Sequence, residues 1–284
     1  MHHEPSQPVT DHAQTLAQRL GAAPQWVWVE VSQTQGSVPR EVGTWMLVSP
    51  QDVVGTIGGG RLEFEAIHLA REGLRQGHIQ ERLRMALGPS LGQCCGGVVE
   101  VSLSLRSGHE LLAHIQAMDA HRRPVALFGG GHVGRALVHT LAPLPYRIHW
   151  VDSRDEIFPS GLPAHVLSEH SDPVQASVWD LPPDSAVLIM SFSHAEDLDI
   201  LAQCLKRRRE RGDLPFIGLI GSKTKWATFR HRLEDKGHTQ AELDGVTCPI
   251  GLGGISGKQP EVIAVAVAAQ LLQVHSPYAS PQTS

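Results

Sequence analysis

The stretch VALFGGGHVG, residues 125–134, decides the fold of the second half of the chain. The apolar run 125–128 leads into a glycine turn, and a helix-like run follows at 135–141. A second strand-like run, 147–151, then ends on Asp152. Strand, glycine turn, helix, strand and acid within about thirty residues form the arrangement that a dinucleotide-binding unit requires. The pattern predicts a Rossmann-type unit, a fold that serves many chemistries.

Each glycine of this turn has a distinct expected role. Gly129 permits the sharp exit from the strand, Gly131 lets the backbone approach a pyrophosphate, and Gly134 allows the helix to pack closely on the sheet. Free N–H groups at the helix N-terminus favour an anion. Asp152 would accept hydrogen bonds from ribose hydroxyls and repel a 2′-phosphate, as for an NAD-type dinucleotide. The alternative is that the glycines serve packing alone.

Composition restricts the class of protein. The chain has 284 residues, of which 41% are hydrophobic and 19% charged, as in an ordinary globular protein of two domains. The net charge of −5 argues against a nucleic-acid partner. The longest apolar stretch, 262–272, is shorter than the roughly 20 residues of a membrane span, and the first 14 residues lack the apolar core of a signal peptide. We expect a cytoplasmic protein without a membrane partner.

The pattern of elements changes near residue 120. Strand-like runs of the second part alternate with helices, and lie at 125–128, 147–151, 186–191 and 216–220. This alternation predicts a parallel sheet covered on both faces. The first part has hairpin-like strand pairs and a helix from residue 62. The expected fold class is therefore α/β, with a Rossmann-like domain at 121–275, a smaller α+β domain before it at 1–115, and a polar tail at 276–284.

A second glycine cluster, Gly58-Gly59-Gly60-Arg61, lies between a strand-like run and a helix-like run. Its backbone N–H groups would point into the loop, with Arg61 at the helix start, which makes it a second candidate anion site. The alternative is a flexible connector. Glu63 fits both interpretations, because an acid in the first helical turn also complements the helix dipole.

Residues 91–97, LGQCCGG, place two adjacent cysteines between glycines. Adjacent cysteines rarely bridge each other, because the resulting ring is strained. The glycines leave the loop open to a large ligand, and a soft thiolate suits a soft or sulfur-liganded metal. Gln93, Cys94 and Cys95 are therefore candidate cofactor-binding residues; the alternative is two small apolar side chains in a turn. The four cysteines of the chain show no iron–sulfur spacing.

Two further segments follow strand-like runs. Ser222 and Lys223 come directly after the run 216–220, at the position where open α/β sheets bind ligands. Residues 248–258 are rich in glycine, but their spacing departs from GxxxxGK[ST]. We therefore count Ser222 and Lys223 among the candidate binding residues and do not expect a nucleoside triphosphatase.

Taken together, these motifs resemble the XdhC/CoxI family of xanthine dehydrogenase accessory proteins. The resemblance covers nearly the whole chain and rests on collinear segments at 36–40, 55–63, 93–97, 129–134, 220–225 and 249–260. It implies a chaperone, not an enzyme, that binds and protects the molybdenum cofactor, supports its sulfuration and inserts it into apo-xanthine dehydrogenase. It also implies three kinds of partner: apo-xanthine dehydrogenase, a cysteine desulfurase and molybdenum cofactor biosynthesis proteins. Cys95, directly before the paired glycines, would contact the molybdenum, with Cys94 as the alternative.

Two other functions stay open from the residues alone. One is an NAD-dependent oxidoreductase that uses the turn at 129–134, and the other is a regulatory module that senses a nucleotide. No catalytic histidine or Tyr–Lys pair is evident for the oxidoreductase. The sequence does not choose between a nucleotide and the pterin cofactor on the Rossmann unit, and it leaves a homodimer open.

Overall fold

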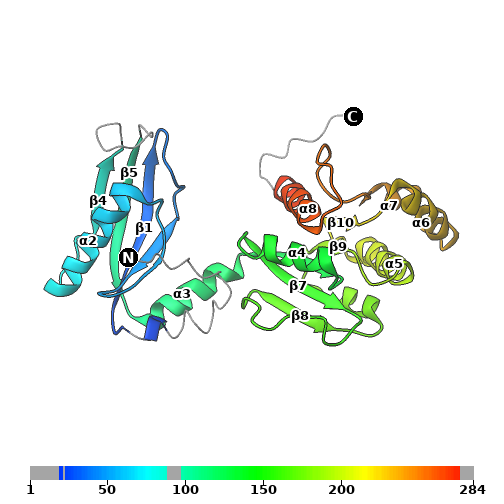
Figure 1. Ribbon diagram of the computed structural model, residues 1–284, viewed down its shortest axis with the longest axis horizontal. Coiled ribbons are helices and arrows are strands. Elements are labelled where there is room, and N and C mark those ends of the chain that lie inside the picture. The colour runs from blue at the N-terminus through cyan, green and yellow to red at the C-terminus, as the bar shows by residue number, and fades with distance from the viewer. Residues whose placement is uncertain (1–18, 22, 88–96, 276–284) are drawn as a thin grey trace. The chain divides into compact units, whose positions relative to one another are not determined.

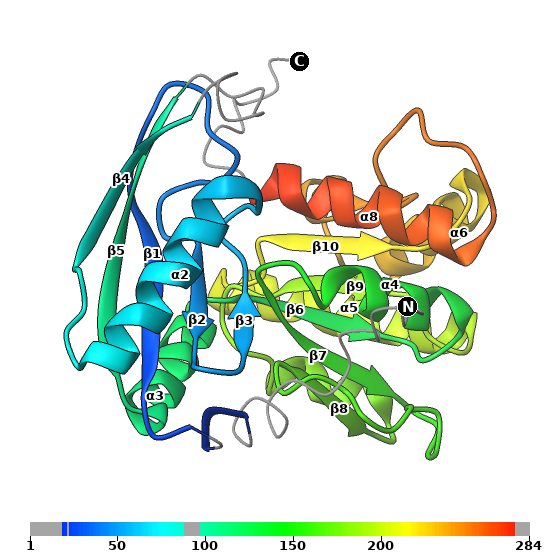
Figure 2. The ribbon, with the colours of Figure 1, turned by 60° about the vertical axis from the view of Figure 1, so that its left-hand side comes forward.

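The computed structural model describes residues 19–21, 23–87 and 97–275. The chain divides into two compact units, of which the first ends at Met118 and the second begins at Asp119. Figures 1 and 2 label elements of both units. No helix of the described ranges is both long enough and apolar enough to cross a membrane.

The first unit is built on an antiparallel sheet of five strands in the order β3-β2-β1-β5-β4. Its elements are β1 (Trp26–Gln35), β2 (Trp45–Val48), β3 (Val53–Gly55), α2 (Gly60–Gln76), β4 (Arg82–Ala86), β5 (Val98–Arg106) and α3 (Gly108–Ala120). Side chains alternate across β1, as they must in a strand. Val27 and Val29 pack with Leu62 of α2, while Trp28 packs with Leu111 of α3, so each helix covers one face. Figure 2 shows α2 running along the sheet.

The second unit is a sheet of six strands in the order β11-β10-β9-β6-β7-β8, and every pair in it is parallel. Its strands are β6 (Arg123–Phe128), β7 (Tyr146–Asp152), β8 (Val166–His170), β9 (Ala186–Ile189), β10 (Phe216–Leu219) and β11 (Val246–Thr247). Its helices are α4 (His132–Leu141), η2 (Val174–Trp179), α5 (His194–Arg211), α6 (Lys223–Asp235), α7 (Gln240–Asp244) and α8 (Pro260–Val274). The chain runs outward from β6 to β8, returns to β9 and continues to β11, which is the doubly wound order.

Both faces of this sheet are buried, which explains the apolar run in β6. Val125 and Leu127 pack in one cluster with residues of α4 and α8, and Phe128 packs in another with residues of α5. The expectation of a doubly covered Rossmann-like sheet after a smaller α+β unit is confirmed. Two strands were not expected from the sequence, β8 and β11. In β8 only Val166 is buried, and β11 has two residues, so neither carries a clear apolar pattern.

Candidate functional site

The candidate site of the second unit lies where the strand order reverses, between β6 and β9. These strands pair directly, with Phe128 opposite Ile189. Ligands of open α/β sheets bind outside the carboxyl ends of the strands at such a reversal. We call the loops that follow β6, β7 and β9, residues 129–131, 152–154 and 191–196, the switch-point site.

Packing requires two of the three fingerprint glycines. Gly129 has φ +124°, and a Cβ there would collide with the carbonyl oxygen of Met190. A Cβ at Gly134 would collide with the carbonyl oxygen of Gly129, so α4 approaches the turn too closely for any side chain. Gly131 differs, because it has φ −69° and a Cβ there would meet no atom within 4 Å. The space at Gly131 is therefore open, as close approach of a ligand would need.

The first turn of α4 carries no acidic side chain of its own. The N-cap of this helix, Gly131, makes no side-chain hydrogen bond. The helix dipole and the unpaired N–H groups of a first turn attract negative charge. The open space at Gly131 and the acid-free first turn are therefore compatible with a phosphate at this end of α4, although Asp152 already accepts the neighbouring N–H of Gly130.

Asp152 is engaged within the protein. Its side chain is buried, with 2% of the residue exposed. The carboxylate accepts the N–H of Gly130 at 2.5 Å, the N–H of Arg154 at 2.8 Å, and two guanidinium N–H groups of Arg154, both at 2.8 Å. Burial alone would raise the pKa of Asp152, but the hydrogen bonds from Arg154 and Gly130 outweigh it and hold the pKa below its ordinary value. A carboxylate offers about four acceptor positions, so none is left here for the ribose that the sequence predicted as its partner.

The half-buried Arg154 and the exposed Phe192 form a pair that no sequence motif predicted. The Arg154 guanidinium carbon lies 4.7 Å from the centre of the Phe192 ring, a cation–π arrangement. Phe192 is 66% exposed. A phenylalanine between two serines, directly after a buried strand, was the signal in the sequence that could have indicated Phe192. The pairing could not be predicted, because Arg154 follows a different strand.

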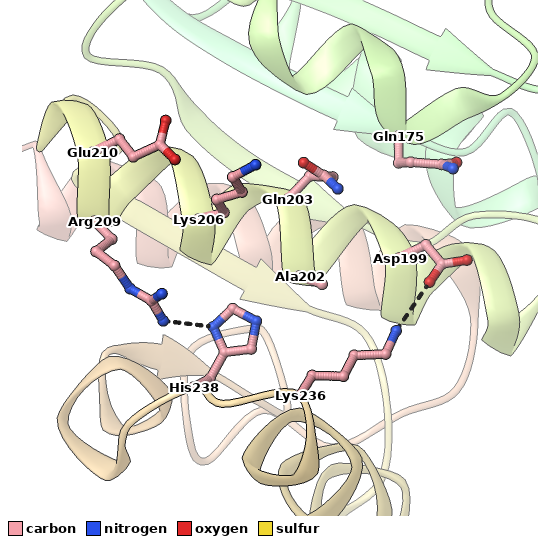
Figure 3. Close-up of a pocket in the computed structure, with 9 residues that line it drawn as sticks. All are labelled: Gln175, Asp199, Ala202, Gln203, Lys206, Arg209, Glu210, Lys236 and His238. Atoms are coloured by element: carbon pink, nitrogen blue, oxygen red, sulfur yellow. Dashed lines mark hydrogen bonds and ion pairs between the residues drawn. The ribbon is translucent and has the colours of Figure 1, made fainter.

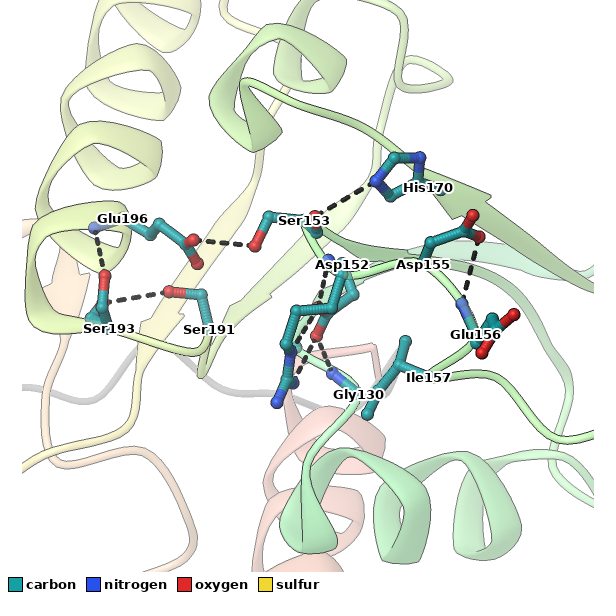
Figure 4. A network of polar contacts seen from close by, with 12 residues as sticks. Gly130, Asp152, Ser153, Asp155, Glu156, Ile157, His170, Ser191, Ser193 and Glu196 are labelled. Carbon is teal, nitrogen blue, oxygen red and sulfur yellow. Dashed lines mark hydrogen bonds and ion pairs between the residues drawn. The ribbon is translucent and has the colours of Figure 1, made fainter.

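Glu196 adds a second carboxylate to this site. Its Oε1 atom accepts the Ser153 hydroxyl at 2.7 Å, and its backbone N–H donates to Ser193 at 3.2 Å (Figure 4). The other carboxylate oxygen, Oε2, is buried and has no hydrogen-bond partner among the described residues. The hydrogen bond to Asp152 raises the pKa of Arg154, and the negative charge of Glu196 raises it further. Two carboxylates thus face one guanidinium.

A buried ion pair joins the first turns of α5 and α6, the helices that follow β9 and β10. Lys225 Nζ donates to Asp197 at 2.5 Å and to the carbonyl of Ile220 at 2.9 Å. Asp197 in turn accepts the N–H and the hydroxyl of Ser191, each at 2.8 Å. Of the residues expected here, Ser222 caps α6 by accepting the N–H of Lys225 at 3.1 Å. Lys223 is exposed in the first turn of that helix.

In the first unit, three of the sequence motifs meet. A Cβ at Gly58 would lie 3.0 Å from Arg40 in the turn at 36–40, and Gly97 donates its N–H to Ser37 of the same turn at 3.1 Å. A Cβ at Gly97 would lie 2.6 Å from that Ser37 carbonyl oxygen. Gly97, the first described residue after the cysteine segment, therefore lies beside the turn at 36–40, and the glycine cluster contacts the same turn. Gln93, Cys94 and Cys95 themselves lie outside the described residues.

The glycine cluster of the first unit is filled by a side chain of its own helix. Glu63 Oε2 accepts the Thr56 hydroxyl at 2.5 Å and the N–H groups of Ile57 and Gly59 at 3.0 and 3.1 Å. All three glycines, Gly58, Gly59 and Gly60, have positive φ, which turns the backbone into this shape. Arg61 pairs with Glu65 at 3.5 Å on the surface. The cluster holds a carboxylate, as an anion site would, but the carboxylate belongs to the chain.

An open pocket of about 450 Å³ lies elsewhere on the second unit (Figure 3). It is lined by residues of η2, α5 and the segment after α6, and by none from the switch-point loops. Two of its cations are paired: Arg209 with Glu242, and Lys236 with Asp199. In the described part of the chain, no group of three or more His, Cys, Asp or Glu side chains could hold a metal ion.

Each unit matches a model of a known protein family. Residues 20–85 match the XdhC and CoxI family, and residues 125–271 match the XdhC Rossmann domain. YqeB of Escherichia coli K12, described as uncharacterized, is 26% identical over 251 residues, which are 86% of this chain but only 42% of YqeB. The crystal structure of a xanthine dehydrogenase from Bacillus halodurans shares the fold, with a TM-score of 0.71, 19% identity and coverage of 94% of this chain and 97% of that one. The Rossmann-domain match alone spans just over half of the sequence, and the chain belongs to the XdhC and CoxI family.

Proposed function

We propose that this protein is a maturation factor for xanthine dehydrogenase, which binds the molybdenum cofactor as cargo and delivers it to the apo-enzyme. The observation that carries the proposal is that both units, at 20–85 and 125–271, match the same family. One match would show a module that many proteins share, whereas two in order support a common role for the whole arrangement. A cysteine desulfurase is the proposed source of sulfur for the cargo.

The residues present are compatible with a cargo that has a phosphate, a flat pterin ring and a thiolate-liganded metal. The open N-terminus of α4 at Gly131 suits the phosphate. A cysteine thiolate suits molybdenum as a soft ligand, and we assign this contact to Cys95. Support for that assignment comes from Gly97, two positions later, which packs beside the turn at 36–40 where two other family motifs meet.

The geometry of Asp152 weighs against the rival function of an NAD-dependent oxidoreductase. The acid that would bind the adenosine ribose is buried and fully hydrogen-bonded to Gly130 and Arg154. We therefore do not extend the proposal to hydride transfer.

Cysteine variants test the cargo assignment. The protein is purified from a host that makes the cofactor, and molybdenum and pterin fluorescence are measured for wild type, C95A, C94A and C204A. Cys204 is a matched control, because burial raises its pKa to about 12 and it packs as a small apolar residue. We expect C95A to lose most of its molybdenum while C204A keeps it. Equal retention by C95A and C204A would refute the contact, and retention lost only in C94A would move it to the neighbouring cysteine.

A second experiment tests the maturation role itself. Purified protein is mixed with xanthine in the presence and absence of apo-xanthine dehydrogenase. We expect oxidation only when the apo-enzyme is added, because the four cysteines of this chain show no spacing for iron–sulfur clusters that would carry electrons away. Sustained xanthine oxidation by the protein alone would overturn the proposal.

A further inference from the structure

We propose that Arg154 and Phe192 form a platform on which the switch-point site stacks the ring of a phosphate-bearing nitrogen heterocycle, and that the same site rejects the ribose diol of NAD. The inference rests on the proposed function in one respect, that the heterocycle is the pterin of the cargo. The ring of the ligand stacks on Arg154 and Phe192, while its phosphate binds at the N-terminus of α4.

The platform and the phosphate position share one edge of the sheet. Met190 donates its N–H to the carbonyl of Phe128 at 2.9 Å, and its own carbonyl oxygen stands where a Cβ of Gly129 would be. Phe192 follows Met190 by two residues, a span of at most about 7 Å for an extended chain. The Phe192 ring and the glycine turn therefore belong to the same site.

The platform is held in place before any ligand arrives. Arg154 donates two guanidinium N–H groups to Asp152, which orients the plane of the guanidinium over Phe192. Asp152 is itself anchored by the N–H of Gly130. Because the side chains are already ordered, stacking a ring on the exposed face of Phe192 costs little conformational entropy. An aromatic side chain that is 66% exposed leaves that face available.

Charge selects what binds at the platform. The guanidinium of Arg154 is already paired with the Asp152 carboxylate, and the Glu196 carboxylate lies on the neighbouring Ser153, so Arg154 offers no uncompensated positive charge to a phosphate. A ribose diol finds no free acceptor on Asp152, whose oxygens already take four hydrogen bonds. A neutral flat ring meets neither obstacle. The phosphate of the same ligand is directed to the N-terminus of α4 at Gly131, whose first turn carries no acid, while the charge of the Asp152 carboxylate at the neighbouring Gly130 is compensated by Arg154.

The test measures binding of 6-hydroxymethylpterin monophosphate, of its unphosphorylated parent and of NADH to the full-length protein, by quenching of the pterin signal and by calorimetry. The variants are F192A, F192W and F64A. Phe64 is a matched control, because it is 68% exposed and lies on α2 of the other unit. Thermal unfolding of each variant checks that it is folded. Because both phenylalanine side chains are exposed, we expect their substitution to leave the fold intact.

We expect F192A to bind the pterin phosphate about tenfold more weakly, the order of effect of one stacked ring. F192W and F64A should stay within about twofold of wild type, and NADH should bind far more weakly than the pterin phosphate. Equal binding by F192A and wild type, no binding of the pterin phosphate by wild type, or NADH binding that matches it would each overturn the inference.

The outcome is distinguishable from failure of the proposed function. If Phe192 governs binding of the pterin phosphate but the purified protein carries no molybdenum, the platform stands and the cargo role fails. If the protein carries molybdenum that depends on Cys95 while F192A binds the pterin phosphate normally, the cargo role stands and the platform is refuted.

Discussion

Substitution of two glycines in one turn separates ligand binding from packing. At Gly134 a methyl group would collide with the carbonyl oxygen of Gly129, and that oxygen also accepts the indole N–H of Trp150 at 2.9 Å. At Gly131 a side chain would point into open space from an extended backbone, with φ −69° and ψ −172°. G134A and G131V therefore change the same turn with opposite expected consequences.

The size of each effect follows from these contacts. Overpacking costs about 1–3 kcal/mol and loss of the Trp150 hydrogen bond about 1 kcal/mol more, offset by about 1 kcal/mol of gained helix propensity. We expect G134A to lose about 2 kcal/mol and to lower the Tm of the second unit by roughly 4–8 °C. G131V should stay within about 1 kcal/mol of wild type, because a reduced entropy of the unfolded chain offsets a poorer N-cap.

The assay combines thermal unfolding with binding of the pterin phosphate used above. G131V should keep its Tm within roughly 4 °C and lose binding by more than about tenfold, because the branched side chain fills the space at the N-terminus of α4. An early transition in G131V, like that of G134A, would show that the position is packed and refute the open-space reasoning. Unchanged binding by G131V would show that no ligand approaches there.

Two other carboxylates give predictions of their own. E63A removes the anion held by Ile57 and Gly59, so it should destabilise the first unit by about 1–3 kcal/mol; inorganic phosphate should raise the Tm of E63A but not of wild type, and no response in E63A would mean that the glycine cluster cannot hold an external anion. The hydrogen bond from Arg209 lowers the pKa of Glu242 from 4.5 to about 2 in the folded protein. A carboxylate whose pKa is lower in the folded than in the unfolded protein stabilises the fold at pH values above its unfolded pKa, and this stabilisation is lost as the pH falls through its folded pKa. The difference in unfolding free energy between wild type and E242Q, measured in urea, should therefore be full above pH 5 and disappear as the pH falls toward 2. A constant difference over that range would contradict the assignment.

Local sequence determined the elements that carry a strong apolar period. The run 125–128 became a strand buried on both faces, and the helix-like run 135–141 lies within α4, which begins three residues earlier at His132 and ends at Leu141. The antiparallel first unit and the parallel second unit were also expected from the spacing of turns and helices. The edge strand β8 and the short β11 were missed, because one buried residue or a total of two residues leaves no period to detect.

Tertiary structure decided what each functional side chain contacts. Arg154 and Phe192 are 38 positions apart in the sequence, and they meet only because β7 and β9 both flank β6 in the sheet. The same strand order places Glu196 beside Ser153. Asp152 could be identified as the acid of a fingerprint, yet its occupation by Gly130 and Arg154 depends on how the loop after β7 folds back. Short-range periodicity reports burial along an element, whereas contacts between loops follow from the order of strands, which no local pattern encodes.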